Sequence, residues 1–268
     1  MLNKLKLKKA YLLLVLAFLY APIFILMLFS FNASRTRGTW GGFSLTWYFA
    51  LFQDRNIAQA LYNTVTIALL SATIAVIIGT LAAVGINNMR RGTKKIVLGL
   101  SSIPVANPDI VTGVSLLILY MSVFRLTDTG RLGYTTLLLA HIAFNIPYVI
   151  LSVLPRFKHM DKHLYEAAMD LGASPGYAFL KVVVPQLMPG IITGWVLAFT
   201  LSVDDFMVSF FTTGAGVSNL SLIIFSMART GVNPMINALS TLMFVFVMIL
   251  LFIINKKGSM KLSKKMRG

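Results

Sequence analysis

Six long stretches of this chain carry almost no charge, and they decide what it can fold into. Each is long enough to cross a bilayer as a helix of about 20 residues. None alternates apolar and polar residues as a barrel strand would. The mean hydropathy of +0.80 is too high for a water-soluble core to hide every apolar side chain. We therefore predict an all-α membrane protein with one transmembrane domain over residues 1–268. The six predicted spans are Ala10–Phe31, Leu61–Ile86, Ile96–Phe124, Leu132–Leu154, Ile191–Thr213 and Met235–Ile254.

The distribution of positive charge predicts the orientation of these spans. In a soluble protein, a net charge of +16 would suggest that the protein binds nucleic acid. Here, 18 of the Lys and Arg residues fall on one side of the spans and 6 on the other. Basic residues favour the cytoplasmic side of a membrane. Both termini and the loop over residues 156–188 are therefore predicted to be cytoplasmic. The basic face is expected to contact anionic membrane lipid, and no nucleic acid is expected as a partner.

Three shorter features add to this picture. The basic N-terminus precedes an apolar run that is too long for a usual signal peptide, so we predict an uncleaved first helix. The run Leu220–Ala228 is too short to span and predicts an extracytoplasmic interfacial or re-entrant helix. In the loop Asn32–Gln59, a short helix is expected at the outer interface, with Trp47 and Tyr48 as anchors.

Thiol and metal chemistry have little support in the sequence. The chain has no cysteine, which excludes disulfides, thiol catalysis and cysteine-based metal sites. His141, His159 and His163 lack metal-ligand spacing with carboxylates, so each is expected to be a satisfied or solvated side chain. No metal site is predicted.

The longest cytoplasmic loop has helix punctuation of its own. Asp161 is placed to cap a short helix that runs to Leu171, and Gly172 suits the left-handed stop. Ser174 and Pro175 can start a second helix, because Ser caps and Pro fits the first helical position. Two further prolines, at 185 and 189, are expected to break that helix before the fifth span. The loop thus predicts a helix-turn-helix shelf at the membrane surface.

Three carboxylates fall inside predicted spans. Asp109 follows Pro104 and Pro108, which are expected to kink the third span around a cavity. Asp204 and Asp205 lie in the fifth span, where adjacent helical residues point roughly 100° apart. Each charge costs about 2.5 to 3.5 kcal/mol on an insertion scale, and no Lys or Arg lies within the spans. We expect neutralisation by protonation, by another chain or by a passing cation. In the alternative, Asp109 caps a half-helix and the Asp pair meets an Arg of a partner chain.

The cytoplasmic shelf carries a recognisable pattern. Its sequence EAAMDLGASPGYAFLKVVVP resembles the EAA loop of binding-protein-dependent ABC importer permeases. Five positions match that pattern: Glu166, Ala167, Ala168, Gly172 and Pro185. Val182 and Val184 stand where the pattern has Ile and Leu, a departure that keeps size. Glu166 and Asp170 lie four apart on one helical face. The resemblance implies a type I ABC importer permease fold, in which these residues couple the chain to an ATPase.

The segments SLTWYFALFQD, IPVANPDIVTGVSLL and LSVDDFMVSFFTTG are similar to those of spermidine/putrescine importer permeases, specifically the second of the two permeases. This resemblance implies a substrate pathway that involves Trp47, Asp109, Asp204 and Asp205, in a multi-pass protein of the bacterial inner membrane. An aromatic face and carboxylates suit a polyammonium cargo. For Trp47 the interfacial anchor is the favoured alternative.

The resemblance also implies partners. These are a second permease subunit, two ATPase subunits and an extracytoplasmic polyamine-binding protein. No Gly-Lys dipeptide occurs, so the chain lacks the phosphate-binding Walker A loop. ATP and Mg are accordingly expected on the ATPase subunits, and this chain is expected to hold no cofactor and to be no enzyme. The alternatives are the same machine with a ferric, thiamine or oxyanion cargo, and a cation carrier that works without ATP.

Overall fold

Helices make up the fold. The structure is a computed structural model that describes residues 2–35, 39–128, 130–161, 163–230 and 234–265. Arg37, Lys162 and Arg267, which entered the charge count, lie outside these residues. Within them the extended backbone forms only one isolated bridge, between Asn32 and Phe43. The elements are α1 (Leu2–Phe29), α2 (Thr46–Gln53), α3 (Arg55–Asn88), α4 (Arg91–Ala106), α5 (Asp109–Thr127), α6 (Tyr134–Val153), η1 (Leu154–His159), α7 (His163–Asp170), α8 (Pro175–Ala178), η2 (Phe179–Val183), α9 (Val184–Asp204), α10 (Met207–Thr212), α11 (Leu220–Thr230) and α12 (Met235–Lys265).

The chain divides into two compact units, and each is described by itself. One unit contains Met1–Ala58 and Ile223–Leu250, and the other contains Gln59–Leu222 and Leu251–Gly268. The second unit includes α4 to α10 and most of α3. It therefore holds every predicted site residue except Trp47.

The all-α membrane class is confirmed. Within the described residues, five helical segments are long and apolar enough to cross a membrane. They are Tyr11–Phe29, Arg55–Asn88, Asp109–Thr127, Tyr134–His159 and Pro175–Asp204. The predicted sixth span corresponds to α12, a continuous helix whose described apolar part is Met235–Ile249. The expected short helices at Leu220 and after Ser44 are present as α11 and α2.

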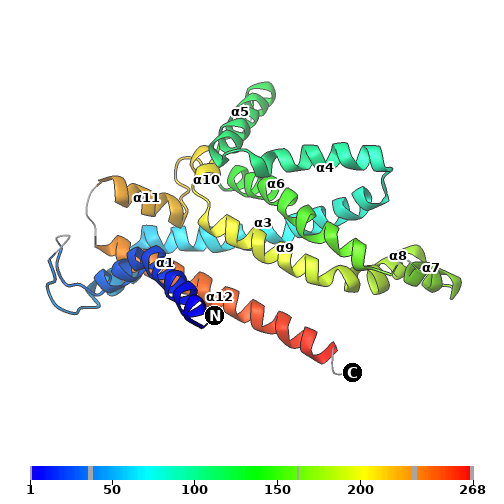
Figure 1. Cartoon of the computed structure of the whole chain (residues 1–268). Coiled ribbons are helices and arrows are strands. Elements are labelled where there is room, and N and C mark those ends of the chain that lie inside the picture. The colour runs from blue at the N-terminus through cyan, green and yellow to red at the C-terminus, as the bar shows by residue number, and fades with distance from the viewer. Residues whose placement is uncertain (1, 36–38, 129, 162, 231–233, 266–268) are drawn as a thin grey trace. The chain divides into compact units, whose positions relative to one another are not determined.

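Close packing of small residues joins α3, α6 and α9. A methyl group on Gly79 of α3 would lie 2.7 Å from Cγ1 of Val149 on α6. One on Gly190 of α9 would lie 2.9 Å from the Ser152 carbonyl oxygen of α6. Such contacts bring helix backbones together, which is how membrane helices associate where lipid offers no hydrophobic drive. Figure 1 shows α6 in green running beside α9 in yellow.

The third predicted span differs from the expected kinked helix. It consists of two separate helices, because α4 ends at Ala106 and α5 begins at Asp109. Asn107 and Pro108 between them are extended, with ψ of 148° and 139°. Pro108 disfavours helical geometry in the residue before it, and the break falls there, whereas Pro104 is accommodated inside α4. In Figure 1, α5 leaves the junction in a different direction from α4.

The second helix of the shelf over residues 156–188 continues into the fifth span. The predicted break at Pro185 and Pro189 is wrong, since α8, the π-helical η2 and α9 follow one another without interruption. Pro185 lies in the first turn of α9, directly after the wider π turn, and Pro189 is accommodated inside α9. A π turn is a local adjustment within a helix, and here it precedes Pro185, which cannot donate a helical hydrogen bond. The helical path from Pro175 to Asp204 has 30 residues and is about 45 Å long.

Candidate functional site

The fifth predicted span breaks at its pair of acidic residues. Helix α9 ends at Asp204, and Asp205 is extended with φ of −65° and ψ of 124°. Helix α10 starts two residues later, at Met207. The expectation that Asp204 and Asp205 are consecutive positions of one helix is therefore wrong. No Pro or Gly lies between Trp195 and Thr213, so the break is not set by a local helix breaker.

Asp205 caps α10. Its Oδ1 accepts a hydrogen bond from the Val208 amide at 3.1 Å, and its Oδ2 accepts one from the Ser209 amide at 2.7 Å. The Ser209 hydroxyl donates a third bond to Oδ2 at 2.8 Å. Asp205 is 8% exposed. A carboxylate at this position satisfies orphan amides of the first turn and complements the positive end of the helix.

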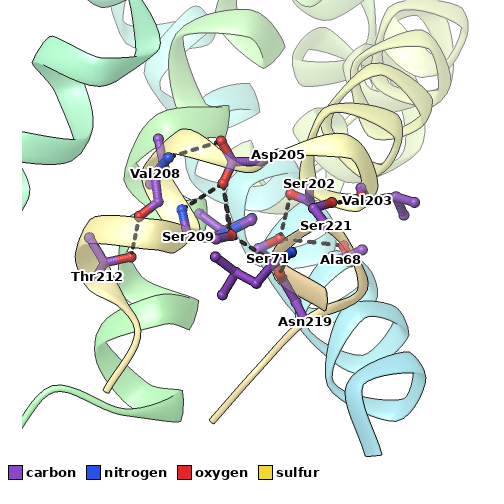
Figure 2. A network of polar contacts seen from close by, with 12 residues as sticks. Ala68, Ser71, Ser202, Val203, Asp205, Val208, Ser209, Thr212, Asn219 and Ser221 are labelled. Carbon is purple, nitrogen blue, oxygen red and sulfur yellow. Dashed lines mark hydrogen bonds and ion pairs between the residues drawn. The ribbon is translucent and has the colours of Figure 1, made fainter. Parts of the chain in front are cut away.

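Two further side chains close around this cap. Nε2 of His141, on α6, lies 3.1 Å from the Ser209 hydroxyl and 3.5 Å from Oδ2 of Asp205. Nδ2 of Asn219 donates to the same Ser209 hydroxyl at 2.7 Å. Figure 2 shows Asp205 and Ser209 at the start of α10, together with Asn219, which directly precedes α11. We call His141, Asp205, Ser209 and Asn219 the Asp205 cluster. The protein itself therefore supplies hydrogen-bond donors for Asp205. The sequence alone predicts that a proton, another chain or a passing cation neutralises this carboxylate.

A second polar layer lies next to the Asp205 cluster. Nδ2 of Asn145 donates to the Ser202 hydroxyl at 2.7 Å, and the Ser71 and Ser202 hydroxyls are 3.0 Å apart. All three side chains are buried. They connect α3, α6 and α9 across the helix interface, as intramembrane hydroxyl and amide groups often do.

The start of α11 is tied to the same bundle. Thr64 of α3 accepts the Leu220 amide at 2.8 Å, and Asn63 donates to the Ser218 carbonyl oxygen at 2.8 Å. The Ser221 hydroxyl donates to the Val203 carbonyl oxygen at 3.2 Å. The segment that follows α10 is thus held against α3 and the last turn of α9.

Asp204 has the opposite environment to Asp205. It is the last residue of α9 and is exposed. The carbonyl groups of a last helical turn lack helical partners and carry partial negative charge. The Asp204 carboxylate adds a full negative charge at that end, so this place favours a cation.

Asp109 is the first residue of α5 and is also exposed. Its helix packs against α10, where a methyl group on Gly113 would lie 3.0 Å from the Met207 carbonyl oxygen. Leu116 of the same helix and Tyr148 of α6 pack against one buried cluster of Ala140, Phe144 and Val208. The structure therefore gathers the first turns of α5, the α9–α10 break and the middle of α6 in one region.

Trp47 belongs to the other unit. Its Nε1 donates to the Asn32 carbonyl oxygen at 2.8 Å, and the neighbouring Tyr48 hydroxyl lies 2.7 Å from that of Ser30. Both rings are half-buried. These bonds fix the segment after α1, so Trp47 has a structural task in this loop whatever else it contacts.

The shelf over residues 156–188 has the predicted caps and left-handed turn. Helix α7 presents an exposed Glu166, whose carboxylate lies 3.5 Å from Nδ1 of His163. Gly172 has φ of +88° and closes the helix, with the Ala173 amide donating to the Ala168 carbonyl oxygen at 3.0 Å. The Ser174 hydroxyl accepts the Tyr177 amide at 3.4 Å as the cap of α8. Glu166 and Asp170 are both exposed on this short helix.

Sequence reasoning missed the residues around Asp205. His141 and Asn145 lie four apart inside an otherwise apolar span, so they share one face of α6. Polar side chains within a membrane helix mark interhelical contacts or functional groups. That spacing could have identified α6 as the partner of the fifth span.

Comparisons with known proteins agree with this architecture. Residues 75–256 match the family "binding-protein-dependent transport system inner membrane component". The chain is 43% identical to the spermidine/putrescine transport system permease protein PotC of Haemophilus influenzae, over 89% of this chain and 91% of that protein. It is 41% identical to the putrescine transport system permease protein PotI of Escherichia coli, over 90% and 87% of the two chains.

Solved structures show the same fold at low identity. A chain of a bacterial ABC transporter for import of the acidic polysaccharide alginate superposes with a TM-score of 0.68 at 17% identity, covering 97% of this chain and 98% of that one. A chain of the MetNI methionine ABC transporter, in an inward-facing conformation, gives 0.59 at 18% identity, covering 76% and 97%. Because the family match and the relatives each span most of the sequence, this chain belongs to the inner-membrane permeases of binding-protein-dependent ABC importers.

Proposed function

We propose that this chain is one of two permease subunits of an ATP-driven importer for polyamines of the spermidine and putrescine class. The observation that carries the proposal is its identity of 41–43% to permeases named for these cargoes, over most of both chains. The fold alone does not identify the cargo, since a chain of an alginate importer shares this fold. The cargo argument therefore also needs chemistry from the site.

The exposed carboxylates suit a polyammonium. Asp204 lies at the negative end of α9, and Asp109 begins α5, the helix that packs against α10. An ammonium group that leaves water can be stabilised by carboxylates and by aromatic faces. No Lys or Arg falls inside the six predicted spans, which disfavours an anionic cargo. We assign Asp109 and Asp204 to the substrate pathway, and Trp47 as a further contact on the outer side. Asp205 contributes to the pathway by capping α10 next to Asp204.

Coupling to ATP is assigned to the shelf. In this proposal two ATPase subunits, which bind ATP and Mg, dock on Glu166, Ala167, Ala168, Asp170 and Gly172. Their closure would move α7 and α8, and the continuous helical path from Pro175 would carry that motion to Asp204. A binding protein would deliver the cargo outside, a second permease would complete the pathway, and both termini would be cytoplasmic in a bacterial inner membrane. The transporter would then expose the cargo alternately to the two sides.

Reconstitution tests this function. The complex that copurifies with a tagged form of this chain is placed in liposomes, and uptake of labelled spermidine and putrescine is measured with and without ATP. We expect saturable uptake that requires ATP and the binding protein, and that excess thiamine, ferric ion or oxyanions do not inhibit. Uptake of one of those competitors in place of polyamine would contradict the cargo. Purification without an ATPase, together with uptake driven by an ion gradient, would instead support a carrier.

A further inference from the structure

His141 is a buried polar side chain that the transport proposal does not use. Its side chain is 1% exposed, and it approaches the Asp205 cap from a different helix. Within the described residues, its Nδ1 has no hydrogen-bond partner. Its Nε2 contacts Ser209 and Asp205, two members of the Asp205 cluster.

The hydrogen bonds of the cluster fix the role of Nε2. The Ser209 hydroxyl has one proton, which it donates to the Asp205 carboxylate, a group that only accepts when ionised. One lone pair of that hydroxyl accepts from Asn219, whose amide orientation is set because its Oδ1 accepts the Leu222 amide at 3.0 Å. The second lone pair remains for His141, so Nε2 must carry a proton and donate. His141 and Asn219 therefore both donate to the Ser209 hydroxyl, and that hydroxyl in turn donates to the Asp205 carboxylate.

This arrangement has a consequence for the shape of the fifth span. The sequence from Trp195 to Thr213 contains no helix breaker and can form one helix. A single helix would place Asp204 and Asp205 on its surface roughly 100° apart. The observed break instead buries Asp205 and leaves Asp204 exposed at a helix end. The capping bonds from Val208 and Ser209 to Asp205 hold that break, and His141 and Asn219 support it from outside α10 through the Ser209 hydroxyl.

We propose that His141 is a positioning residue that holds Asp205 as the cap of α10, and thereby leaves Asp204 as the carboxylate of the pair that meets a cationic cargo. Donation from Nε2 to Ser209 fixes the hydroxyl that bonds Asp205, and without it the cap loses one of its supports. The assignment of a cargo to Asp204 rests on the proposed function. The link from His141 to the exposure of Asp204 does not.

Thiol labelling tests the positioning directly, because the chain has no native cysteine. The Asp204→Cys variant of the full complex is reconstituted and treated with a cationic methanethiosulfonate reagent, and the labelling rate of this subunit is measured without cargo. The same measurement follows in His141→Leu and His141→Gln backgrounds. The Gln side chain can donate from its amide to Ser209, whereas Leu cannot. We expect Leu to change the labelling rate about ten-fold and Gln to leave it within about two-fold.

Two further arms keep the outcomes distinct. If His141→Leu does not assemble, Ser209→Ala removes the same acceptor, retains both backbone bonds to Asp205 and should shift the rate in the same direction. Equal labelling rates in the wild-type and Leu backgrounds, or a Gln variant that behaves like Leu, would overturn the positioning role. Protection of the introduced thiol by spermidine is then measured in the Asp204→Cys variant that retains His141. Loss of that protection, with the His141 effect intact, would count against the polyamine cargo and leave the positioning role standing.

In an uptake assay of chains that retain Asp204, His141→Leu should raise the KM for spermidine about ten-fold, and we expect a similar rise for Asp204→Asn in a separate variant. His141→Gln should restore it. A lowered maximal rate at unchanged KM in the Leu variant would indicate general damage to the fold and would contradict the assignment.

Discussion

Asp204 and Asp205 are consecutive residues with opposite surroundings. Asp205 is buried and accepts three hydrogen bonds, two from backbone amides and one from Ser209. Asp204 ends α9 and is exposed. A buried carboxylate with directed donors stabilises the fold around it, while an exposed one remains free to bind.

The two residues should therefore respond differently to loss of charge. In Asp205→Asn, the NH2 group replaces one accepting oxygen and faces groups that also donate. We expect this substitution to lower the free energy of unfolding by about 1–3 kcal/mol. Asp204→Asn should leave that free energy within about 0.5 kcal/mol. Thermal unfolding of the two purified variants measures the difference. Equal destabilisation would contradict the division between a capping and a free carboxylate.

The fold was largely predictable from local patterns, whereas the site was not. Gly172, Ser174 and Pro175 correctly predicted the shelf, because caps and left-handed turns depend on a few adjacent residues. The Asp205 cluster also includes His141 and Asn219, which come from other parts of the chain. Periodicity reports which residues form a helix but not where a distant side chain interrupts it.

The Ser209 hydroxyl joins the cluster, so its removal should be costly. In Ser209→Ala the buried donors of His141 and Asn219 lose their shared acceptor, and an unsatisfied buried donor costs about 1–3 kcal/mol. Ser122→Ala is the matched control, because its exposed hydroxyl bonds only the Ile118 carbonyl oxygen of its own helix. Chemical unfolding of both variants in detergent should show a loss in the first and little in the second. A neutral Ser209→Ala would contradict the importance of this acceptor.

Asn145 offers a contrasting expectation. Its Oδ1 is buried without a partner in the described residues, and its Nδ2 bonds a Ser202 hydroxyl that also contacts Ser71. Replacing Asn145 by Leu removes the unsatisfied oxygen and leaves the two hydroxyls to pair with each other. We expect a change in unfolding free energy of less than about 1 kcal/mol. A loss as large as that of Ser209→Ala would show that the second polar layer is as important as the first.

Contact between α5 and α10 requires the absence of a side chain at Gly113. A methyl group there would lie 2.8 Å from Cδ2 of Phe211 and 3.0 Å from the Met207 carbonyl oxygen. The carbonyl cannot move independently of α10, so Gly113→Ala should push the two helices apart at a cost of about 1–3 kcal/mol. Gly99→Ala on α4 is the control, because nothing lies within 4 Å of its added methyl. Unfolding midpoints and ATP-dependent uptake should fall in the first variant and be retained in the second.

Glu166 should matter for coupling but not for folding. It is 72% exposed on α7, and its contact within the chain is the exposed His163 at 3.5 Å. Exposed substitutions of this kind usually change stability by no more than about 0.5 kcal/mol, so Glu166→Ala should unfold like the wild type. Since the shelf is the proposed docking place of the ATPase, the variant should lose most of its transport-linked ATP hydrolysis while the complex still captures its loaded binding protein. Asp161→Ala serves as the control, because it removes a nearby exposed carboxylate that accepts the His163 amide. Coupled ATPase activity in liposomes, measured beside binding-protein capture, decides the matter: unchanged coupling in Glu166→Ala, or equal loss in Asp161→Ala, would remove Glu166 from the interface.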